Sequence, residues 1–341
     1  MKVLYAIQGT GNGHLSRAKE VIPALMSRCQ VDILVSGTKS QVTLPYDIKY
    51  RLKGIPLARS KNGRINYFRT LLSVNIFRLI KEIRKVKVHE YDLVINDFEP
   101  ISAWACIFKR MVHCVSLSHQ CALLANTTPG PKRKSRFGIW FLKNYAPSTS
   151  KYGFHFQSYA NWIHPPIIRE DIRKQSVKQK KYHVVYLPTY SDEKIIQVLK
   201  RFRTEKWKVF SKNANSSYKK SNVQIQPICK KSFKRSMAWS RGIICSAGFE
   251  APAEALYLRK KLMVIPTKGL EQQYNAAALE SLGVDVCNSF DDSIILQIKK
   301  WLRKTNAVEL EFPDKTQFII DEIISNHIVA TELSNKILQN I

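Results

Sequence analysis

The sequence predicts an α/β protein of two domains, each built around a parallel sheet, and three observations support this fold class. The chain has 341 residues, more than twice the ~150 residues of an average domain. Short apolar runs alternate with longer amphipathic stretches, which is typical of strands and helices in βα units. This alternation occurs twice, before and after a polar segment that begins at Pro165 and Pro166. Two such domains leave a cleft between them, at which loops that follow the strands can bind a ligand.

Four apolar runs in each half are the expected strands. In the first half they cover residues 2–7, 31–35, 93–96 and 114–118. In the second half they cover residues 183–187, 207–210, 242–245 and 262–265. We therefore expect a first domain over 1–163, a linker over 164–181 and a second domain over 182–314. Apolar residues at helical spacing predict a helix within 315–341 that can pack back on the first domain.

Composition narrows the class of protein. With 45% hydrophobic residues the chain can fill two cores, which excludes a disordered protein. No apolar run approaches the ~18 residues of a membrane span. The first residues lack the pattern of a secretory leader, so we expect a cytoplasmic protein. The seven cysteines contain no CxxC pair, which indicates neither a disulfide framework nor a zinc site.

A glycine-rich loop, GTGNGH, joins the first expected strand to a helix. The backbone N–H groups of Gly11, Asn12 and Gly13 and the positive end of the helix suit a phosphate group. A dinucleotide fingerprint is excluded, because His14 stands at the third glycine position and the next strand ends without an acidic residue. No Gly-Lys-Ser/Thr closes a P-loop. His14 is a candidate base for a hydroxyl group, or else it bonds its own helix turn.

A second loop follows the expected strand 242–245 and leads into another helix, whose N-terminus would face a diphosphate. Glu254, one turn into that helix, can accept hydrogen bonds from ribose hydroxyls. After the strand 262–265, a further helix start presents polar side chains on one face. Each could have a purely structural role, but their order favours a ligand site. The candidates are Ser246, Ala247, Gly248, Phe249, Glu250, Glu254, Glu271, Gln272 and Asn275.

Together these motifs resemble a known group of enzymes. GTGNGH near the start, and SAGFEAPAEAL, VIP and EQQYNAAAL near the end, are similar to motifs of GT-B-fold glycosyltransferases, above all glycosyltransferase family 28 and the UDP-glycosyltransferases. The resemblance implies two Rossmann-like domains facing a cleft. It also implies transfer of a sugar from a nucleotide-sugar, UDP-linked, to a hydroxyl acceptor, with inversion at the sugar carbon and no cofactor beyond this co-substrate.

The same resemblance assigns roles to individual residues. It implies that Gly248 and Phe249 lie at the diphosphate and Glu254 at the ribose. It places Glu271 and Gln272 at the sugar hydroxyls. His14 matches a histidine that serves as a base or an acceptor-site residue in several of these families.

Polar residues also follow the two expected strands in the middle of the first domain. Asp97 and Glu99 follow the strand 93–96, and His119 follows the strand 114–118. Either carboxylate can orient His14, or cap the next helix instead, and His119 is an alternative base. Because no DxD motif occurs, we expect metal-independent chemistry in which helix N-termini and basic side chains stabilise the departing diphosphate.

Basic residues are in large excess, with 55 Lys and Arg against 26 Asp and Glu, a net charge of +29. Eleven basic residues and one acid lie within 51–87, and a basic run at 132–136 precedes a group of aromatic residues. Both segments suit the anionic inner face of the cell membrane and a lipid-linked or cell-envelope acceptor, unless the charge reflects genome composition alone. The residues proposed for this acceptor or membrane side are Glu99, Arg136, Trp140 and Phe141.

Two other classes of protein compete with a glycosyltransferase. A nucleotide-sugar epimerase of the same fold needs no acceptor site, so the basic and aromatic segment counts against it. A nucleic-acid-binding protein is favoured by charge alone. The basic clusters are scattered and no zinc-finger spacing or RNP-like motif occurs, so we expect no nucleic-acid partner.

Overall fold

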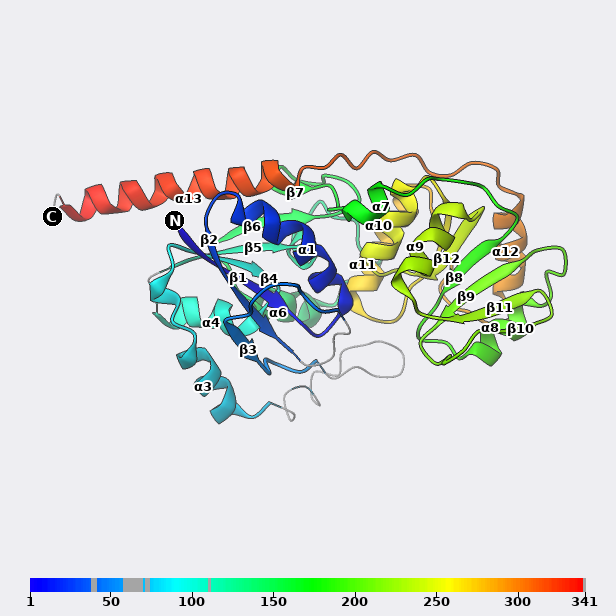
Figure 1. Ribbon diagram of the computed structural model, residues 1–341, viewed down its shortest axis with the longest axis horizontal. Coiled ribbons are helices and arrows are strands. Elements are labelled where there is room, and N and C mark those ends of the chain that lie inside the picture. The colour runs from blue at the N-terminus through cyan, green and yellow to red at the C-terminus, as the bar shows by residue number, and fades with distance from the viewer. Residues whose placement is uncertain (38–41, 58–69, 71–73, 110–111, 340–341) are drawn as a thin grey trace.

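The computed structural model describes residues 1–37, 42–57, 70, 74–109 and 112–339, and side chains as far as residue 327. The chain folds into two α/β units at opposite ends of an elongated molecule (Figure 1), which confirms the predicted fold class. Each unit contains one sheet with helices on its faces.

The first sheet has the strand order β3-β2-β1-β4-β5-β6-β7, and every neighbouring pair is parallel. Its strands are β1 (Lys2–Gln8), β2 (Gln30–Ser36), β3 (Tyr50–Leu52), β4 (Leu93–Asp97), β5 (His113–Ser118), β6 (Ser150–Phe154) and β7 (Ile163–His164). The helices of this unit are α1 (Asn12–Met26), α3 (Ile76–Lys85), the 3-10 turn η1 (Val88–Glu90), α4 (Pro100–Lys109), α5 (His119–Ala122) and α6 (Arg136–Tyr145).

The second sheet has the order β10-β11-β9-β8-β12-β13-β14 and is parallel except for the pair β10 and β11. Its strands are β8 (His183–Tyr186), β9 (Trp207–Ser211), β10 (Tyr218–Lys220), β11 (Val223–Pro227), β12 (Gly242–Ser246), β13 (Lys261–Ile265) and β14 (Asp285–Val286). The helices after β7 are α7 (Glu170–Arg173), α8 (Asp192–Leu199), α9 (Lys230–Trp239), α10 (Glu250–Tyr257), α11 (Leu270–Ser281) and α12 (Ile294–Arg303).

All eight strands expected from apolar runs are present, within one or two residues at each end. The central strands are detectable because helices cover both faces of a parallel sheet, so every residue of β4 is buried. The strands without a clear signal lie toward the sheet edges. They are short or partly polar, and all three residues of β10 are exposed.

The last helix returns to the first unit. Helix α13 (Thr316–Gln339) follows a long extended segment that crosses the molecule from the second unit (Figure 1). Ile319, Ile320 and Ile323 are buried in the same cluster as apolar residues of α1. Arg28, two residues after the end of α1, also donates two hydrogen bonds to Asp321, at 2.8 and 3.0 Å.

Candidate active site

The loops after the strands of both sheets meet at a cleft of about 330 Å³. Its walls include the loops after β1, β4 and β5 and helix α6 in the first unit, and the loops after β12 and β13 in the second. The first residues of α1, α10 and α11 all line it. The first backbone N–H groups of a helix have no partner within the helix, and they carry partial positive charge. Three such helix starts at one cleft favour an anionic ligand.

His14 is fixed by a carboxylate at the cleft. Its Nδ1 lies 2.8 Å from Oδ1 of Asp97, the last residue of β4. Burial by itself would raise the pKa of Asp97, but Arg17 and His14 outweigh it and hold this pKa below its usual value. The other ring nitrogen of His14, Nε2, lies 3.3 Å from Nε2 of Gln120, and both side chains line the cleft. An ionised Asp97 therefore orients an imidazole whose second nitrogen lies beside Gln120 in the lining of the cleft.

Arg17 is a further residue of this site, and it was not among the residues predicted from the sequence. The side chain is buried, and its Nη2 donates to both carboxylate oxygens of Asp97, at 2.7 and 2.9 Å. Its Nη1 donates to Oε1 of Glu250, the first residue of α10, at 2.8 Å. Its position three residues after His14 could have indicated this role, because that spacing places both side chains on one face of α1. Arg17 thus joins the carboxylate beside His14 to the second unit.

Phe98 follows Asp97 and has a left-handed backbone, with φ of 57°. A bulky residue rarely adopts this conformation, which costs of order 1–3 kcal/mol and is often found at functional sites. Its ring centroid lies 6.4 Å from that of His14 in a stacked arrangement and 4.8 Å from that of Tyr145. The strained turn therefore places an aromatic ring beside the imidazole at the cleft.

His119 is the second histidine at the cleft. Its ring stacks on Phe249 with a centroid distance of 4.6 Å and an interplanar angle of 1°. Its Nε2 lies 3.1 Å from Oε1 of Glu271. Burial lowers the pKa of His119, although the nearby Glu271 carboxylate opposes that shift. His119 thus lies between a ring and a carboxylate that both belong to the second unit.

Most of the residues predicted to bind the nucleotide-sugar donor, called the donor-side residues below, lie together at this cleft. Those that line it are Gly11, Asn12, Gly13, Ser246, Gly248, Phe249, Glu250, Glu271 and Gln272. Burial raises the pKa of Glu250 to about 7, a shift that Arg17 opposes and Glu254 reinforces. Glu250 therefore carries less negative charge at neutral pH than an ordinary carboxylate.

Three predicted donor-side residues are not in the lining of the cleft. Ala247 and Asn275 are buried behind the loop, where Nδ2 of Asn275 donates to the Ala247 carbonyl at 3.1 Å. The Asn275 side chain thus braces the loop through the Ala247 backbone, and neither side chain lines the cleft. Glu254 lines a neighbouring pocket and accepts a hydrogen bond from Nε of Arg169, in the segment before α7, at 2.6 Å. A role of Glu254 at a ribose therefore requires it to leave or share this partner.

The residues predicted for the acceptor side separate into two groups. Phe141 lines the cleft, and Trp140 and Arg136 are exposed on α6. The prediction for Glu99 is wrong, because this residue is fully buried. Its carboxylate accepts hydrogen bonds from the backbone N–H groups of Ile101 and Ser102, at 2.8 and 2.6 Å, and so caps α4.

Gly248 offers a direct test of whether the loop between β12 and α10 contacts a diphosphate. A Cβ added there would meet no protein atom within 4 Å. Gly248→Ala should therefore leave the free energy of unfolding unchanged or raise it by up to about 1 kcal/mol, because it restricts the unfolded chain. If a diphosphate approaches this backbone, affinity for the nucleotide-sugar should fall by about tenfold or more. Thermal unfolding and calorimetric titration measure the two effects.

Gly242→Ala is the matched control, because its Cβ would lie 2.7 Å from Cζ2 of Trp301 and 3.0 Å from the Lys261 carbonyl oxygen. This variant should lose about 1–3 kcal/mol of stability through overpacking. Unchanged nucleotide-sugar affinity in Gly248→Ala would show that the ligand does not lie against the loop.

The sequence matches one family model, described as glycosyl transferase family 1, over residues 1–305. No curated protein matches the sequence significantly. The match covers both sheets and every strand of the structure.

Solved structures share the fold along the whole chain. UGT2 of Phytolacca americana, solved with UDP-2fluoro-glucose and pterostilbene, has a TM-score of 0.57 and 13% identity, with 100% of this chain and 99% of that chain covered. MurG of Acinetobacter baumannii has a TM-score of 0.54 and 16% identity, with coverage of 95% and 99%. A UDP-N-acetylglucosamine 2-epimerase has a TM-score of 0.57 and 12% identity, with coverage of 96% for both chains. Transferases and an epimerase are equally similar, so the fold alone does not separate the two reactions.

Proposed function

The chain belongs to glycosyl transferase family 1, and from this premise we propose that it transfers a sugar from a UDP-linked donor to a hydroxyl acceptor, with inversion and without a metal ion. The main support for the proposal is the pair of His14 and Asp97 at the cleft, where Nδ1 of His14 lies 2.8 Å from Oδ1 of Asp97. A sugar transfer to a hydroxyl group needs one base for one proton, and this pair supplies it. The family match favours this reaction over epimerisation.

In the proposed mechanism His14 is the general base. Its Nε2 takes the proton of the acceptor hydroxyl while that oxygen forms a bond to the anomeric carbon of the sugar. The bond from this carbon to the diphosphate oxygen breaks on the opposite side, so the configuration inverts. Asp97 bonds the other ring nitrogen, Nδ1, and stabilises the imidazolium that forms.

The departing diphosphate is proposed to lie against the starts of α10 and α1. Backbone N–H groups at helix starts stabilise negative charge as it develops, without rearranging. Gly248 leaves open space at this position. The raised pKa of Glu250 lowers the negative charge beside the diphosphate at neutral pH.

The proposal is tested by incubating the protein with a series of nucleotide-sugars and measuring nucleoside diphosphate release with and without acceptors. We expect release from a UDP-sugar that depends on a hydroxyl acceptor, with lipid-linked and soluble acceptors compared. Epimerised nucleotide-sugar without release of UDP would instead support an epimerase. Salt-sensitive binding of DNA or RNA, without binding of any nucleotide-sugar, would contradict an enzyme of either kind.

We further propose that the first unit contacts an anionic membrane surface on the cytoplasmic side, where it would meet a lipid-linked or cell-envelope acceptor. Helix α3 packs inward through Ile83 and leaves Phe77 87% exposed, next to several Lys and Arg residues. On α6, Trp140 is 58% exposed after a run of exposed basic residues at 132–136. Much of the basic segment 51–87, namely 58–69 and 71–73, lies outside the described residues.

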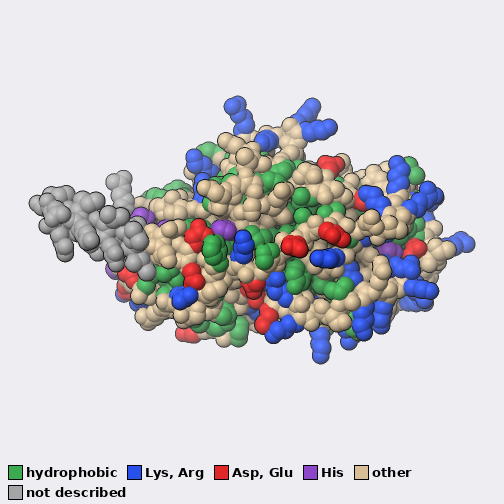
Figure 2. Space-filling view, turned by 90° about the horizontal axis from the view of Figure 1, so that it is seen from above, with side chains coloured by type: hydrophobic (Ala, Val, Ile, Leu, Met, Phe, Trp, Pro, Cys, Tyr) green, Lys and Arg blue, Asp and Glu red, His purple; other side chains and the backbone are tan. Residues whose placement is uncertain are grey.

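Charge alone does not mark this surface. On the face shown in Figure 2, Lys and Arg side chains are spread over both units. The membrane proposal therefore depends on the exposed apolar side chains of α3 and α6 beside the basic ones. No helix in the described part of the chain is long and apolar enough to cross a membrane.

Binding to anionic vesicles at physiological salt checks the membrane proposal. Phe77→Ser and Trp140→Ser should each weaken binding by about tenfold, because a fully buried aromatic side chain contributes roughly 1.5–3 kcal/mol. Leu296→Ser is the control. Leu296 on α12 of the second unit is 61% exposed, and its loss should leave vesicle binding unchanged. Equal weakening by all three variants, or no binding by the wild type, would contradict the proposal.

A further inference from the structure

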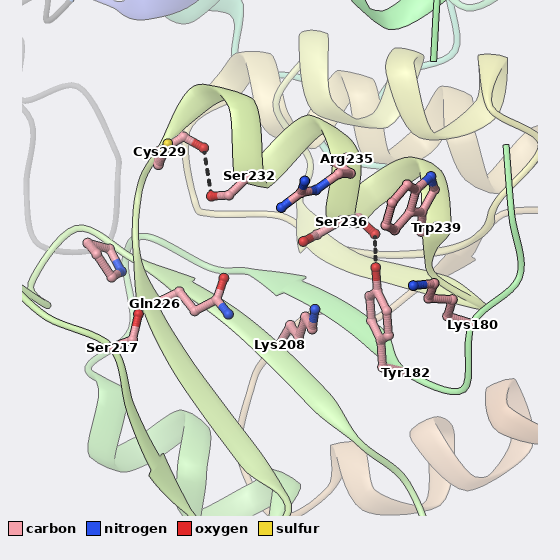
Figure 3. Close-up of a pocket in the computed structure, with 11 residues that line it drawn as sticks. Lys180, Tyr182, Lys208, Ser217, Gln226, Cys229, Ser232, Arg235, Ser236 and Trp239 are labelled. Atoms are coloured by element: carbon pink, nitrogen blue, oxygen red, sulfur yellow. Dashed lines mark hydrogen bonds between the residues drawn. The ribbon is translucent and has the colours of Figure 1, made fainter. Parts of the chain in front are cut away.

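A second pocket, of about 460 Å³, lies within the second unit and shares no lining residue with the active-site cleft. Figure 3 shows that it is formed between α9 above and the strands β9 and β11 below. The contributions of α9 are spaced three, four and seven residues apart, so they lie on one face of the helix. The lining residues are Lys180, Tyr182, Lys208, Ser217, Gln226, Pro227, Cys229, Ser232, Arg235, Ser236 and Trp239.

The charge in this pocket has one sign. Lys180, Lys208 and Arg235 line it, and no Asp or Glu is among its lining residues. The pKa of Lys208 is lowered by burial and then by the charges of Lys180 and Arg235. The three cations therefore repel one another, and nothing in the lining neutralises them.

Aromatic rings hold these cations in place. The Lys180 Nζ lies 4.4 Å from the ring centroid of Trp239, and the Arg235 Cζ lies 5.5 Å from the same ring. The Lys208 Nζ lies 4.2 Å from the ring of Tyr182. A cation over a ring is attracted to it and keeps its full charge and its N–H donors. The ammonium and guanidinium groups are thus positioned without a carboxylate, so their charge stays available to a ligand.

We propose that this α9 pocket binds the phosphate group of a small soluble phosphomonoester. Lys and Arg supply the positive charge that a phosphate requires, and Arg offers parallel N–H donors for its oxygens. Gln226 adds a neutral amide donor from the wall opposite α9 (Figure 3). The Ser232 hydroxyl donates to the Cys229 carbonyl at 3.2 Å, so its oxygen can only accept a hydrogen bond from a protonated phosphate oxygen. The volume falls within the ~300–1,000 Å³ of small-molecule sites, so the pocket has room for more than a lone ion.

Inorganic phosphate and glycerol 3-phosphate are the two probes. Each should raise the Tm of the full-length protein more than sodium chloride at the same ionic strength, because a ligand that binds the folded state stabilises it. If the occupant is a phosphomonoester, glycerol 3-phosphate should bind at least as tightly as inorganic phosphate. Lys208→Gln and Arg235→Gln should each lower the affinity measured by calorimetry by about tenfold or more. Lys208→Arg keeps the charge and should keep most of the binding.

Two controls separate this pocket from other sites. Lys299→Gln removes one exposed positive charge from α12, outside the pocket, and should leave phosphate affinity unchanged. In the absence of ligand, Lys208→Gln should be as stable as the wild type or more so, because it relieves repulsion. A Tm response no larger than that to chloride, or full phosphate affinity in Lys208→Gln, would overturn the proposal. So would tighter binding of inorganic phosphate than of glycerol 3-phosphate.

Discussion

His14→Ala is expected to lower the turnover number by about 10²- to 10⁴-fold, the usual contribution of a positioned general base. Its affinity for the nucleotide-sugar should change little, because His14 faces the acceptor hydroxyl in the proposed mechanism and not the diphosphate. Turnover under saturating donor, together with calorimetric donor binding, separates these two quantities. Asp97→Asn should also reduce turnover, because the amide cannot stabilise the imidazolium as a carboxylate does.

His119→Ala is the comparison that decides between the two histidines. His119 is buried against Phe249 and faces Glu271, so its loss should affect donor binding and packing more than proton transfer. A larger loss of turnover in His119→Ala than in His14→Ala, with donor affinity intact, would transfer the base role to His119. Near-normal turnover in His14→Ala would contradict the proposed mechanism outright.

The residues on either side of Phe98 illustrate what the sequence could predict about the site. Asp97 and Glu99 follow the same strand, so their position at the cleft end of β4 was predictable. Which one would orient His14 was not, because both could cap the next helix. The left-handed turn at Phe98 separates them, so that Asp97 bonds the side chains of α1 and Glu99 caps α4. The residue type of Phe98 does not predict a left-handed backbone, so this turn could not be predicted from the sequence.

Two ion pairs between residues far apart in the chain could also not be predicted from the sequence. Arg17 and its partner Glu250 are 233 residues apart in the chain. Arg169 and its partner Glu254 are 85 residues apart. Any of the many Lys and Arg residues was a possible partner for either carboxylate. The choice depends on how the start of α1 meets the start of α10, which only the three-dimensional arrangement determines. The glycine loops were predictable because close backbone packing and helix starts require particular residue types in a fixed order.

Arg17→Met should lower the free energy of unfolding by about 3–5 kcal/mol, the usual cost of leaving a buried ionic partner uncompensated. In the wild type, Arg17 bonds both Asp97 and Glu250, and Asp97 is fully buried. Methionine fills a similar volume but removes the charge that keeps the pKa of Asp97 low. Only His14 then opposes the effect of burial, so the pKa of Asp97 rises and its ionised form destabilises the folded state. Urea unfolding at neutral pH measures the loss.

The pH dependence and a second substitution identify the cause of that loss. In the wild type the lowered pKa of Asp97 contributes stability above its unfolded value of about 3.9, and this is lost as the pH falls through the lowered pKa. In Arg17→Met the pKa is raised instead, so the penalty grows as the pH rises above about 4. The stability difference should therefore be widest near neutral pH and narrow below pH ~4. Adding Asp97→Asn to Arg17→Met should restore part of the stability, because the uncompensated charge is gone. A deficit that is independent of pH and additive with Asp97→Asn would point to lost packing around α1 instead of an unpaired carboxylate.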